Sequence, residues 1–329
     1  MKKIMIRRAG SPEVFEIVDA PVPVLKENEV LIDIKAVGLN WSEVMIRRGD
    51  WPMELSQGVT LGAEGAGVVE AVGDKIAHIK PGDRVANLEV LAYLDPAQGN
   101  YAEKIAVNAD KVLKIPDHMS FAEGAAIPMA MATAFDALIN HSPLPEDGTV
   151  VVTACTGSVG IAALQLARRK GLRVIGTTRA HNKVSMIESL GVEALVCSDP
   201  ANLKERLSAK VGDKGIDYVF DPVGGATASQ LLSLLNYNGT CVIYGSMDPS
   251  PFTSSSNFLF HQLKVHGYVV LKNLADPKKL QVVWSEILPL IETKEVLVPV
   301  HKTFPFDKVA EAHKAMERHE HFGKLVLVR

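Results

Sequence analysis

Hydrophobic and polar positions alternate along the first third of the chain. Val30, Ile32, Ile34 and Ala36 occupy every second position, a period that predicts a half-buried strand. The run from 61 to 73 is extended and apolar but contains four glycines, which favour bulges, bends or close backbone approach within a compact barrel-like domain. We therefore expect the N-terminal part to be mostly β.

The pattern changes at Ser120, where Ser-Phe-Ala-Glu forms a capping box with Glu123 and predicts the start of a helix. From Gly148 to about Gly245, short buried strands alternate with amphipathic helices. This alternation predicts βαβ units and a doubly wound parallel sheet. After a Pro/Ser-rich stretch, a strand, two helices and a terminal strand over 324–328 are expected to return to the first domain.

The length of 329 residues favours two domains. We place their boundaries so that 1–122 and 259–329 form the β-rich domain and 123–258 forms the doubly wound domain. Of all residues, 47% are hydrophobic and 22% charged, which is typical of a folded globular protein rather than a disordered chain. A net charge of -3 provides no field to gather phosphates, so we expect no nucleic-acid partner.

Three cysteines lie far apart and none forms a C-x-x-C pair, so neither a disulfide framework nor a structural zinc site is expected. The sequence contains no apolar run of about 18 residues, and its N-terminus lacks the apolar centre and cleavage site of a signal peptide. These features predict a cytoplasmic protein that does not span a membrane.

The segment 150-VVVTACTGSVGIAALQLARRKGLRVIGTTR-179 places a glycine turn between a buried strand and a helix. The three glycine positions of a dinucleotide fingerprint read Cys155, Gly157 and Gly160, so the first glycine is replaced. The order of strand, turn, helix and strand still predicts a pyrophosphate site. Its residues are Thr156, Gly157, Ser158, Val159 and Gly160. The alternative is a strand-to-helix turn of another doubly wound protein.

The residues at the end of the second strand of this segment indicate which coenzyme is bound. NAD-specific sites carry a carboxylate there, whereas this chain has Thr178 and Arg179, followed by Lys183. Charge-assisted hydrogen bonds from the two cations to a 2′-phosphate favour NADPH over NADH. The alternative is that both cations belong to a solvated helix start.

With these residues in view, the chain resembles the zinc-independent quinone oxidoreductase, or zeta-crystallin-like, branch of the medium-chain dehydrogenase/reductase superfamily. The resemblance spans nearly the whole chain, and its motifs occur in the family's order. They are 62-GAEGAGVVEAVG-73, PGDRV at 81–85, A-x-x-G-x-V-G at 154–160, 217-DYVFDPVGG-225 and the terminal GKLVL. The resemblance implies an α/β protein in which a GroES-like catalytic domain, built from both ends of the chain, flanks a Rossmann domain.

Departures from zinc-dependent relatives predict that no functional metal is bound. Asn40 stands where those enzymes carry a cysteine ligand, and Ala63-Glu64 stands where they carry His-Glu. Catalytic zinc needs three protein ligands, and too few remain.

The resemblance also implies the roles of individual residues. Asn40 would donate its side-chain amide to the substrate oxygen, Trp51 would form an aromatic wall, and Thr133 would lie near the nicotinamide. Ordinary structural roles remain open for all three: a turn residue, core packing and a helix-internal hydrogen bond, respectively. Gly245, Ser246 and Lys324 are implied to contact the coenzyme.

The implied function is NADPH-dependent transfer of hydride, without a metal, to a quinone or another activated, α,β-unsaturated carbonyl acceptor. Water would deliver the proton, because relatives' tyrosines are replaced by Met45 and Trp51. A homodimer is implied through pairing of the last Rossmann strands. The alternative is an NADPH-binding sensor or crystallin-like protein with low turnover.

Overall fold

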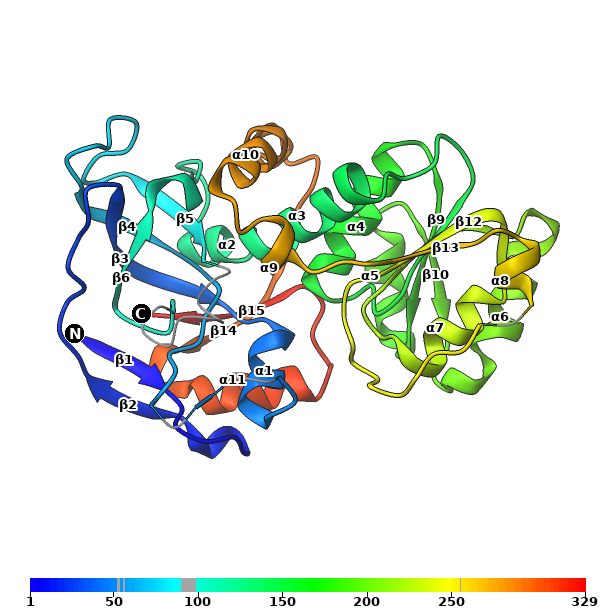
Figure 1. Ribbon diagram of the computed structural model, residues 1–329, viewed down its shortest axis with the longest axis horizontal. Helices are drawn as coiled ribbons and strands as arrows, with labels where there is room; N and C mark the ends of the chain where they lie inside the picture. The colour runs from blue at the N-terminus through cyan, green and yellow to red at the C-terminus, as the bar shows by residue number, and fades with distance from the viewer. Residues whose placement is uncertain (52–53, 56, 90–98, 255) are drawn as a thin grey trace. The chain divides into compact units, whose positions relative to one another are not determined.

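The two ends of the chain fold together, and the middle folds by itself. In the computed structural model, one compact unit comprises Met1–Ala132 and Val270–Arg329, and the other comprises Thr133–Val269. The structure describes all residues except 52–53, 56, 90–98 and 255. Figure 1 shows the order of elements from the N-terminus to the C-terminus. We call the two bodies the catalytic unit and the Rossmann unit.

The catalytic unit is built on a seven-stranded sheet with the order β14-β15-β3-β4-β5-β7, in which β6 also pairs with β3. Its strands are β3 (Glu29–Gly38), β4 (Glu64–Val72), β5 (Arg84–Leu88), β6 (Lys104–Asn108), β7 (Val112–Lys114), β14 (Val300–Pro305) and β15 (Lys324–Val328). A separate hairpin joins β1 (Lys2–Met5) to β2 (Glu16–Asp19). The residues predicted to alternate along β3 are all buried, and the expected return of the C-terminal strand is confirmed.

The glycines of β4 allow close backbone approach. A Cβ added at Gly67 would lie 2.1 Å from the Asp33 carbonyl oxygen, and one at Gly65 would lie 2.5 Å from Asn100 Oδ1. The pairing of β3 with β4 also shifts register twice. These positions therefore need glycine for space, as the sequence indicated.

Helix α2 (Phe121–Ala125) shows why the unit boundary falls later than the predicted residue 123. The capping box is confirmed, since the Ser120 N–H donates to Glu123 and the Glu123 N–H donates back to Ser120 Oγ at 3.2 Å. Ala125 packs with Ala36 and Ala66 of β3 and β4, which places α2 in the catalytic unit. Similarly, β13 pairs with β12, so the Rossmann unit extends beyond 258.

The other helices of the catalytic unit are α1 (Trp41–Arg48), α9 (Val270–Asn273), α10 (Pro277–Glu292) and α11 (Val309–Glu317), and α3 (Pro128–Phe135) crosses the boundary between the units. Short 3-10 turns are η1 (Pro12–Val14), η3 (Ala109–Lys111), η5 (His181–Lys183), η6 (Pro200–Asn202), η7 (Gly212–Lys214) and η8 (Phe306–Lys308), and η4 (Asp136–His141) is a π-helical segment.

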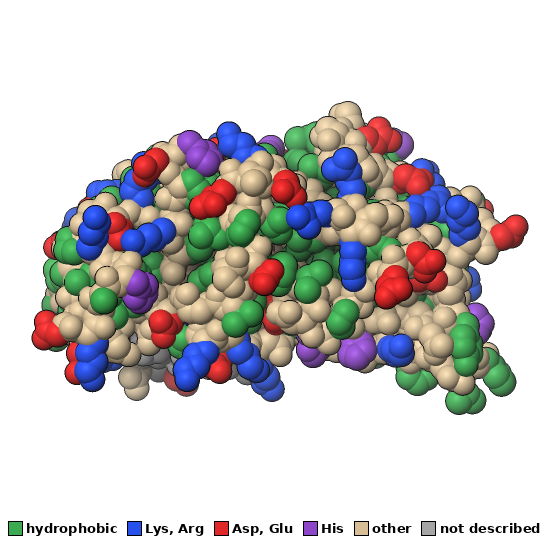
Figure 2. Space-filling model, turned by 90° about the horizontal axis from the view of Figure 1, so that it is seen from above, with side chains coloured by type: hydrophobic (Ala, Val, Ile, Leu, Met, Phe, Trp, Pro, Cys, Tyr) green, Lys and Arg blue, Asp and Glu red, His purple; other side chains and the backbone are tan. Residues whose placement is uncertain are grey.

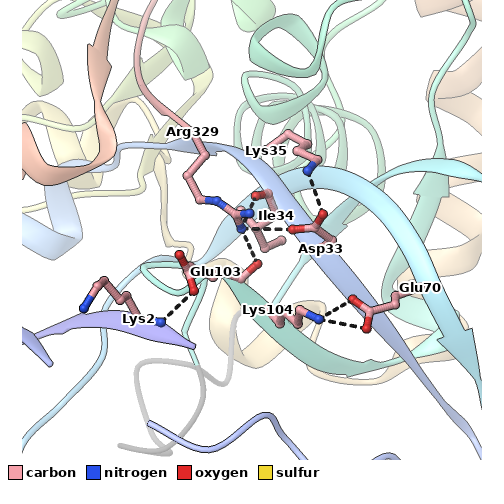
Figure 3. A network of polar contacts seen from close by, with 8 residues as sticks. All are labelled: Lys2, Asp33, Ile34, Lys35, Glu70, Glu103, Lys104 and Arg329. Atoms are coloured by element: carbon pink, nitrogen blue, oxygen red, sulfur yellow. Dashed lines mark hydrogen bonds and ion pairs between the residues drawn. The ribbon is translucent and has the colours of Figure 1, made fainter. Parts of the chain in front are cut away.

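A polar network ties the C-terminal residue to the sheet (Figure 3). The Arg329 guanidinium donates to Asp33 Oδ1 at 2.9 Å and to the carbonyl oxygens of Ile34 and Glu103 at 3.0 and 2.8 Å. Lys35 pairs with the other oxygen of Asp33 at 2.6 Å. The end of β15 is thereby fixed against β3 and β6.

The Rossmann unit contains a six-stranded parallel sheet with the order β10-β9-β8-β11-β12-β13. Its elements are β8 (Thr149–Val152), α4 (Ser158–Arg169), β9 (Arg173–Thr178), α5 (Val184–Glu188), β10 (Glu193–Val196), α6 (Leu203–Val211), β11 (Ile216–Asp221), α7 (Gly225–Leu232), β12 (Leu235–Ile243), α8 (Asn257–Phe260) and β13 (Lys264–Gly267). Strand order reverses between β8 and β11, and ligands of such sheets bind at the carboxyl ends of strands beside the reversal.

Two surface properties bear on partners. Figure 2 shows positive and negative side chains interspersed over one face, in keeping with the small net charge. One helical stretch among the described residues, Phe121–His141, is long and apolar enough to cross a membrane by length and composition. The sequence reading missed it, but 83% of its apolar window is buried within the structure, as in the core helix of a globular protein.

Candidate functional site

The turn between β8 and α4 has the form expected of a phosphate site. Gly157 caps α4 without a side chain, and the first turn of this twelve-residue helix contains no acidic residue. The backbone N–H groups of a helix's first turn have no partner within the helix and carry partial positive charge. Ala154 takes the left-handed conformation, with φ of 44°, which turns the chain from strand to helix.

The two glycines of the turn serve different purposes. A Cβ at Gly160 would lie 2.7 Å from Cys155 Cα, so glycine there permits the helix to pack on the strand end. A Cβ at Gly157 would meet only the Ala154 carbonyl oxygen, at 3.7 Å, and Gly157 has an ordinary φ of −77°. Gly157 is therefore notable for the open space beside its Cα and not for a strained backbone conformation. This open turn fits the approach of a pyrophosphate.

Cys155 is a buried structural residue of this turn. Its side chain is fully buried, and burial raises the pKa of the thiol to about 12. A thiol that stays protonated is a poor nucleophile, so the role of Cys155 is to pack beneath the turn.

The predicted 2′-phosphate residues lie beyond β9. Lys183 is buried, and its Nζ donates to Thr156 Oγ1 at 3.3 Å. Arg179 is exposed, whereas Thr178 is buried and accepts the Ala180 N–H at 3.3 Å. The structure therefore brings Lys183 against the phosphate turn and leaves Arg179 accessible to solvent.

Gly245 and Ser246 follow β12, and their loop packs on the loop after β11. A Cβ at Gly245 would lie 2.6 Å from the Pro222 carbonyl oxygen. Asp221, which ends β11, accepts the N–H groups of Val223 and Gly224 at 3.1 and 2.8 Å. Burial raises the pKa of this carboxyl. The DPVGG motif was part of the family resemblance, but the sequence did not indicate that Asp221 shapes this loop.

A buried polar cluster lies in the catalytic unit around Asn40, Glu64 and Lys324. The Lys324 ammonium, with 1% of its side chain exposed, forms an ion pair with the fully buried Glu64. Lys324 Nζ also donates to Asn40 Oδ1 at 2.8 Å, and Asn40 Nδ2 donates to Glu64 Oε1 at 3.0 Å. Glu64 Oε2 accepts the Met129 N–H at 2.7 Å. We call Asn40, Glu64 and Lys324 the Lys324 cluster.

Asn40 has the turn role that the sequence left open, because it is the N-cap of α1 and its N–H donates to Glu43 Oε2 at 3.0 Å. Its amide side chain nevertheless points into the Lys324 cluster. Asn40 Nδ2 also donates to the Gly38 carbonyl at 3.4 Å, so both N–H groups of the amide have protein partners in this structure.

A second buried chain of hydrogen bonds, which sequence reasoning missed, adjoins the cluster. Glu43 accepts the Ala63 N–H at 3.2 Å and the Tyr101 hydroxyl at 2.7 Å, and Tyr101 Oη lies 2.9 Å from His313 Nε2. Glu43, Tyr101 and His313 are fully buried. Burial raises the pKa of Glu43, although its hydrogen bonds and the charge of Lys324 oppose the increase.

His313 gives the catalytic unit a specific sensitivity to acid. Burial, assisted by the positive charge of Arg47, lowers the pKa of His313 from 6.5 to about 3. The neutral imidazole therefore contributes stability above pH 6.5 that is lost as pH falls toward 3. Relative to His313→Phe, we expect the free energy of unfolding to fall by about 1.4 kcal/mol per pH unit below about pH 6.

Denaturant titrations of both proteins between about pH 7 and pH 5 measure this difference. The neighbouring Glu43 takes up a proton more readily in the folded protein and opposes the trend, but it is present in both proteins. Parallel stability curves would contradict the assignment.

Two residues that the resemblance assigned to the reaction site remain, Trp51 and Thr133. Trp51 is half-buried in the catalytic unit, and Thr133 is buried at the start of the Rossmann unit. The Arg47 side chain is 1% exposed and pairs with Glu317. Among the described residues, no group of three or more His, Cys, Asp or Glu side chains is placed to hold a metal ion.

Comparisons with known proteins agree with this geometry. Residues 26–117 match the alcohol dehydrogenase GroES-like domain family, and residues 158–292 match the zinc-binding dehydrogenase family. Quinone oxidoreductases of Sus scrofa and Homo sapiens are each 29% identical to this chain, over 100% and 95% of it and 98% and 93% of their own lengths. The Escherichia coli quinone oxidoreductase, solved with NADPH, is 27% identical with full coverage of both chains and a TM-score of 0.88.

The fold, the phosphate turn and these similarities define an oxidoreductase of the medium-chain class. The chain belongs to the zinc-independent quinone oxidoreductase branch of the medium-chain dehydrogenase/reductase superfamily.

Proposed function

We propose that this enzyme uses NADPH to reduce quinones or other α,β-unsaturated carbonyl compounds, without a metal. The observation that carries the proposal is the basic edge of the phosphate turn, where Lys183 contacts Thr156 and no carboxylate ends β9. The related Escherichia coli enzyme, solved with NADPH, supports the choice of coenzyme.

Each group of predicted residues has a separate task in this proposal. The turn 156–160 and the N-terminus of α4 would hold the pyrophosphate, Arg179 and Lys183 the 2′-phosphate, and Gly245 and Ser246 the ribose of the nicotinamide. Bound NADPH supplies a hydride from its nicotinamide C4. The Asn40 N–H that makes the long 3.4 Å contact with the Gly38 carbonyl would turn to the acceptor's carbonyl oxygen instead and stabilise its developing negative charge. Trp51 and Thr133 would border the reacting rings.

In this proposal the ammonium of Lys324 would take the place of a metal by polarising Asn40. Lys324 is held beside Asn40 by Glu64, so the amide that receives the substrate oxygen is polarised by a fixed ammonium. Lys324 would also contribute to coenzyme binding. Protonation of the reduced acceptor is assigned to water, because Met45 and Trp51 replace the tyrosines expected in relatives.

The decisive experiment follows nicotinamide absorbance as NADPH or NADH is mixed with 1,4-quinones and with α,β-unsaturated aldehydes or ketones. We expect acceptor-dependent oxidation of NADPH that survives chelation and proceeds without stoichiometric zinc. Tight NADPH binding with no oxidation by any acceptor would favour the alternative of a sensor or crystallin-like protein. Activity that requires zinc would reject the metal-free mechanism.

The two glycines of the turn provide a separate test of coenzyme binding. Gly157→Ala should leave stability within about 0.5 kcal/mol of wild type but weaken NADPH at least tenfold, because its Cβ fills the approach to the turn. Gly160→Ala should instead destabilise the unit by about 1–3 kcal/mol, because its Cβ meets backbone. Thermal unfolding without coenzyme and fluorescence titration with NADPH measure the two effects. Equal NADPH affinity in Gly157→Ala and wild type would remove the turn from the coenzyme site.

A homodimer is part of the proposal. β13 is an edge strand of the Rossmann sheet, and the neighbouring α8 exposes Leu259 and Phe260, each 72% accessible. An edge of this kind is an aggregation hazard unless it is paired. Sedimentation should give twice the mass of the chain, and Leu259→Lys together with Phe260→Lys should shift the protein toward monomer. A wild-type monomer at micromolar concentration would reject this part.

A further inference from the structure

We propose that Glu43 is a positioning residue for Asn40, and that Tyr101 and His313 hold its carboxylate in the position that this role requires. The inference rests on the proposed function, in which Asn40 orients the acceptor oxygen. None of Glu43, Tyr101 and His313 belongs to the dinucleotide site, and all three lie in the catalytic unit.

The carboxylate of Glu43 joins two separate segments of backbone. Oε2 accepts the Asn40 N–H at 3.0 Å, and Oε1 accepts the Ala63 N–H at 3.2 Å. Asn40 begins α1, whereas Ala63 immediately precedes Glu64, the partner of Lys324. One side chain therefore sets the separation between the chain segments that carry Asn40 and Glu64, two of the three members of the Lys324 cluster.

Hydrogen bonds from two asparagine side chains restrain the backbone on either side of Ala63 and Glu64. Asn100 Nδ2 donates to the Gly62 carbonyl at 3.1 Å, and Asn87 Nδ2 donates to the Gly65 carbonyl at 3.3 Å. The two asparagines also exchange amide hydrogen bonds at 2.9 and 3.1 Å. The Ala63 side of the bridge is thus rigid, so a change in Glu43 is transmitted to Asn40.

Proton positions in the chain follow from the partners of each atom. An ionised Glu43 requires the Tyr101 hydroxyl to donate to it, so His313 must donate its Nε2–H to the Tyr101 oxygen. His313 Nδ1 is then unprotonated, and among the described residues it has no hydrogen-bond partner. The reverse arrangement, with Glu43 protonated, would bury an unpaired Nδ1–H under the influence of the Arg47 cation. The positive charge of Arg47 favours the first arrangement.

Aromatic packing fixes the histidine at the end of this chain. The ring of Phe15 contacts His313 edge-on, with centroids 4.6 Å apart. His313 therefore orients the Tyr101 hydroxyl toward Glu43, and Tyr101 orients the carboxylate toward the two N–H groups. Through these contacts Glu43 acts on Asn40 without touching substrate or coenzyme.

A double-mutant cycle tests the proposal. Tyr101→Phe removes one hydroxyl and keeps the ring, while Asn40→Ala removes the amide but keeps the N–H bonded to Glu43. We expect Tyr101→Phe to lower kcat about tenfold or more in the wild type, with the Kd for NADPH unchanged within about twofold. In the Asn40→Ala background the same change should lower kcat by less than about twofold. Equal losses in both backgrounds, or no loss in the wild type, would overturn the proposal.

Tyr218→Phe is the matched control. The Tyr218 hydroxyl is also buried and donates to a carbonyl, that of Ser142 at 2.7 Å, but it lies in the Rossmann unit and outside the proposed binding residues. Its loss should cost similar thermal stability and leave kcat within about twofold. A drop in kcat equal to that of Tyr101→Phe would show that general loosening explains both, which would reject positioning.

Amide hydrogen exchange gives a measurement that does not require turnover. Tyr101→Phe should speed exchange of the Asn40 and Ala63 amides about tenfold or more, because their acceptor is no longer held, and should leave the amides of β11 unchanged. Unaltered exchange at Asn40 and Ala63 would overturn the positioning role even if the enzyme proved active. If the wild type reduced no acceptor but exchange rose as expected, the proposed function would fail while Glu43 remained the residue that orders Asn40.

Discussion

Lys324→Met should lower the free energy of unfolding by about 3–5 kcal/mol, because it leaves the carboxylate of Glu64 buried without its cation. Methionine nearly preserves the length and volume of the lysine side chain, so the loss reports charge rather than packing. Adding Glu64→Gln should restore much of this stability, since a neutral amide needs no counter-ion. Denaturant titration of the single and double variants measures both effects.

An exposed ion pair provides the control for this result. Lys75 pairs with Glu27 at 2.6 Å, but both side chains are more than 60% exposed. Lys75→Met should therefore change stability by no more than about 1 kcal/mol. If Lys324→Met were no more destabilising than Lys75→Met, the ammonium would not be balancing Glu64, and the polarisation assigned to the Lys324 cluster would be wrong.

Removing both cations beyond β9 should have the largest effect on coenzyme choice. Arg179→Ala combined with Lys183→Ala should weaken NADPH about 100-fold or more while changing NADH by less than about fivefold, because charge-assisted hydrogen bonds to the 2′-phosphate each contribute about 1.5–3 kcal/mol. Fluorescence titrations with both coenzymes, at low and high salt, measure the ratio. Screening by salt should shrink the difference between wild type and variant.

Lys214→Ala is the control for this comparison, because Lys214 is exposed and precedes β11, at the amino end of the sheet. It should affect neither coenzyme. Equal losses of NADPH and NADH in the double variant would show that Arg179 and Lys183 do not read the 2′-phosphate, and that Lys183 serves only to support Thr156.

Local patterns predicted the elements and the phosphate turn, because each depends on residues close together in sequence. The capping box at Ser120 spans four residues, and Gly157 and Gly160 act on the strand end that immediately precedes them. Element ends depend more on distant contacts: helix α7 ends at Leu232, since Leu235 already packs in the core of the sheet.

The two buried hydrogen-bond networks could not be predicted from the sequence. Tyr101 is 58 positions from Glu43 and 212 from His313, and Lys324 is 284 positions from Asn40. No periodicity links such residues, and each of them has ordinary structural uses. The resemblance directed attention to Asn40 and Lys324 separately, but the ion pair of Lys324 with Glu64 emerges only when β15 is placed beside β3.

The central place of β15 constrains how the protein is made. β15 lies between β14 and β3, so a strand that is translated early and one that is translated much later share one sheet. During synthesis the Rossmann unit can assemble as soon as its own residues leave the ribosome. In contrast, β6 can pair only with the first half of β3, and residues 36–38 stay unpaired on that side until translation reaches 324–328. A waiting apolar strand is a natural substrate for chaperones, and premature termination just before Gly323 would yield a chain with a finished coenzyme domain and an incomplete partner.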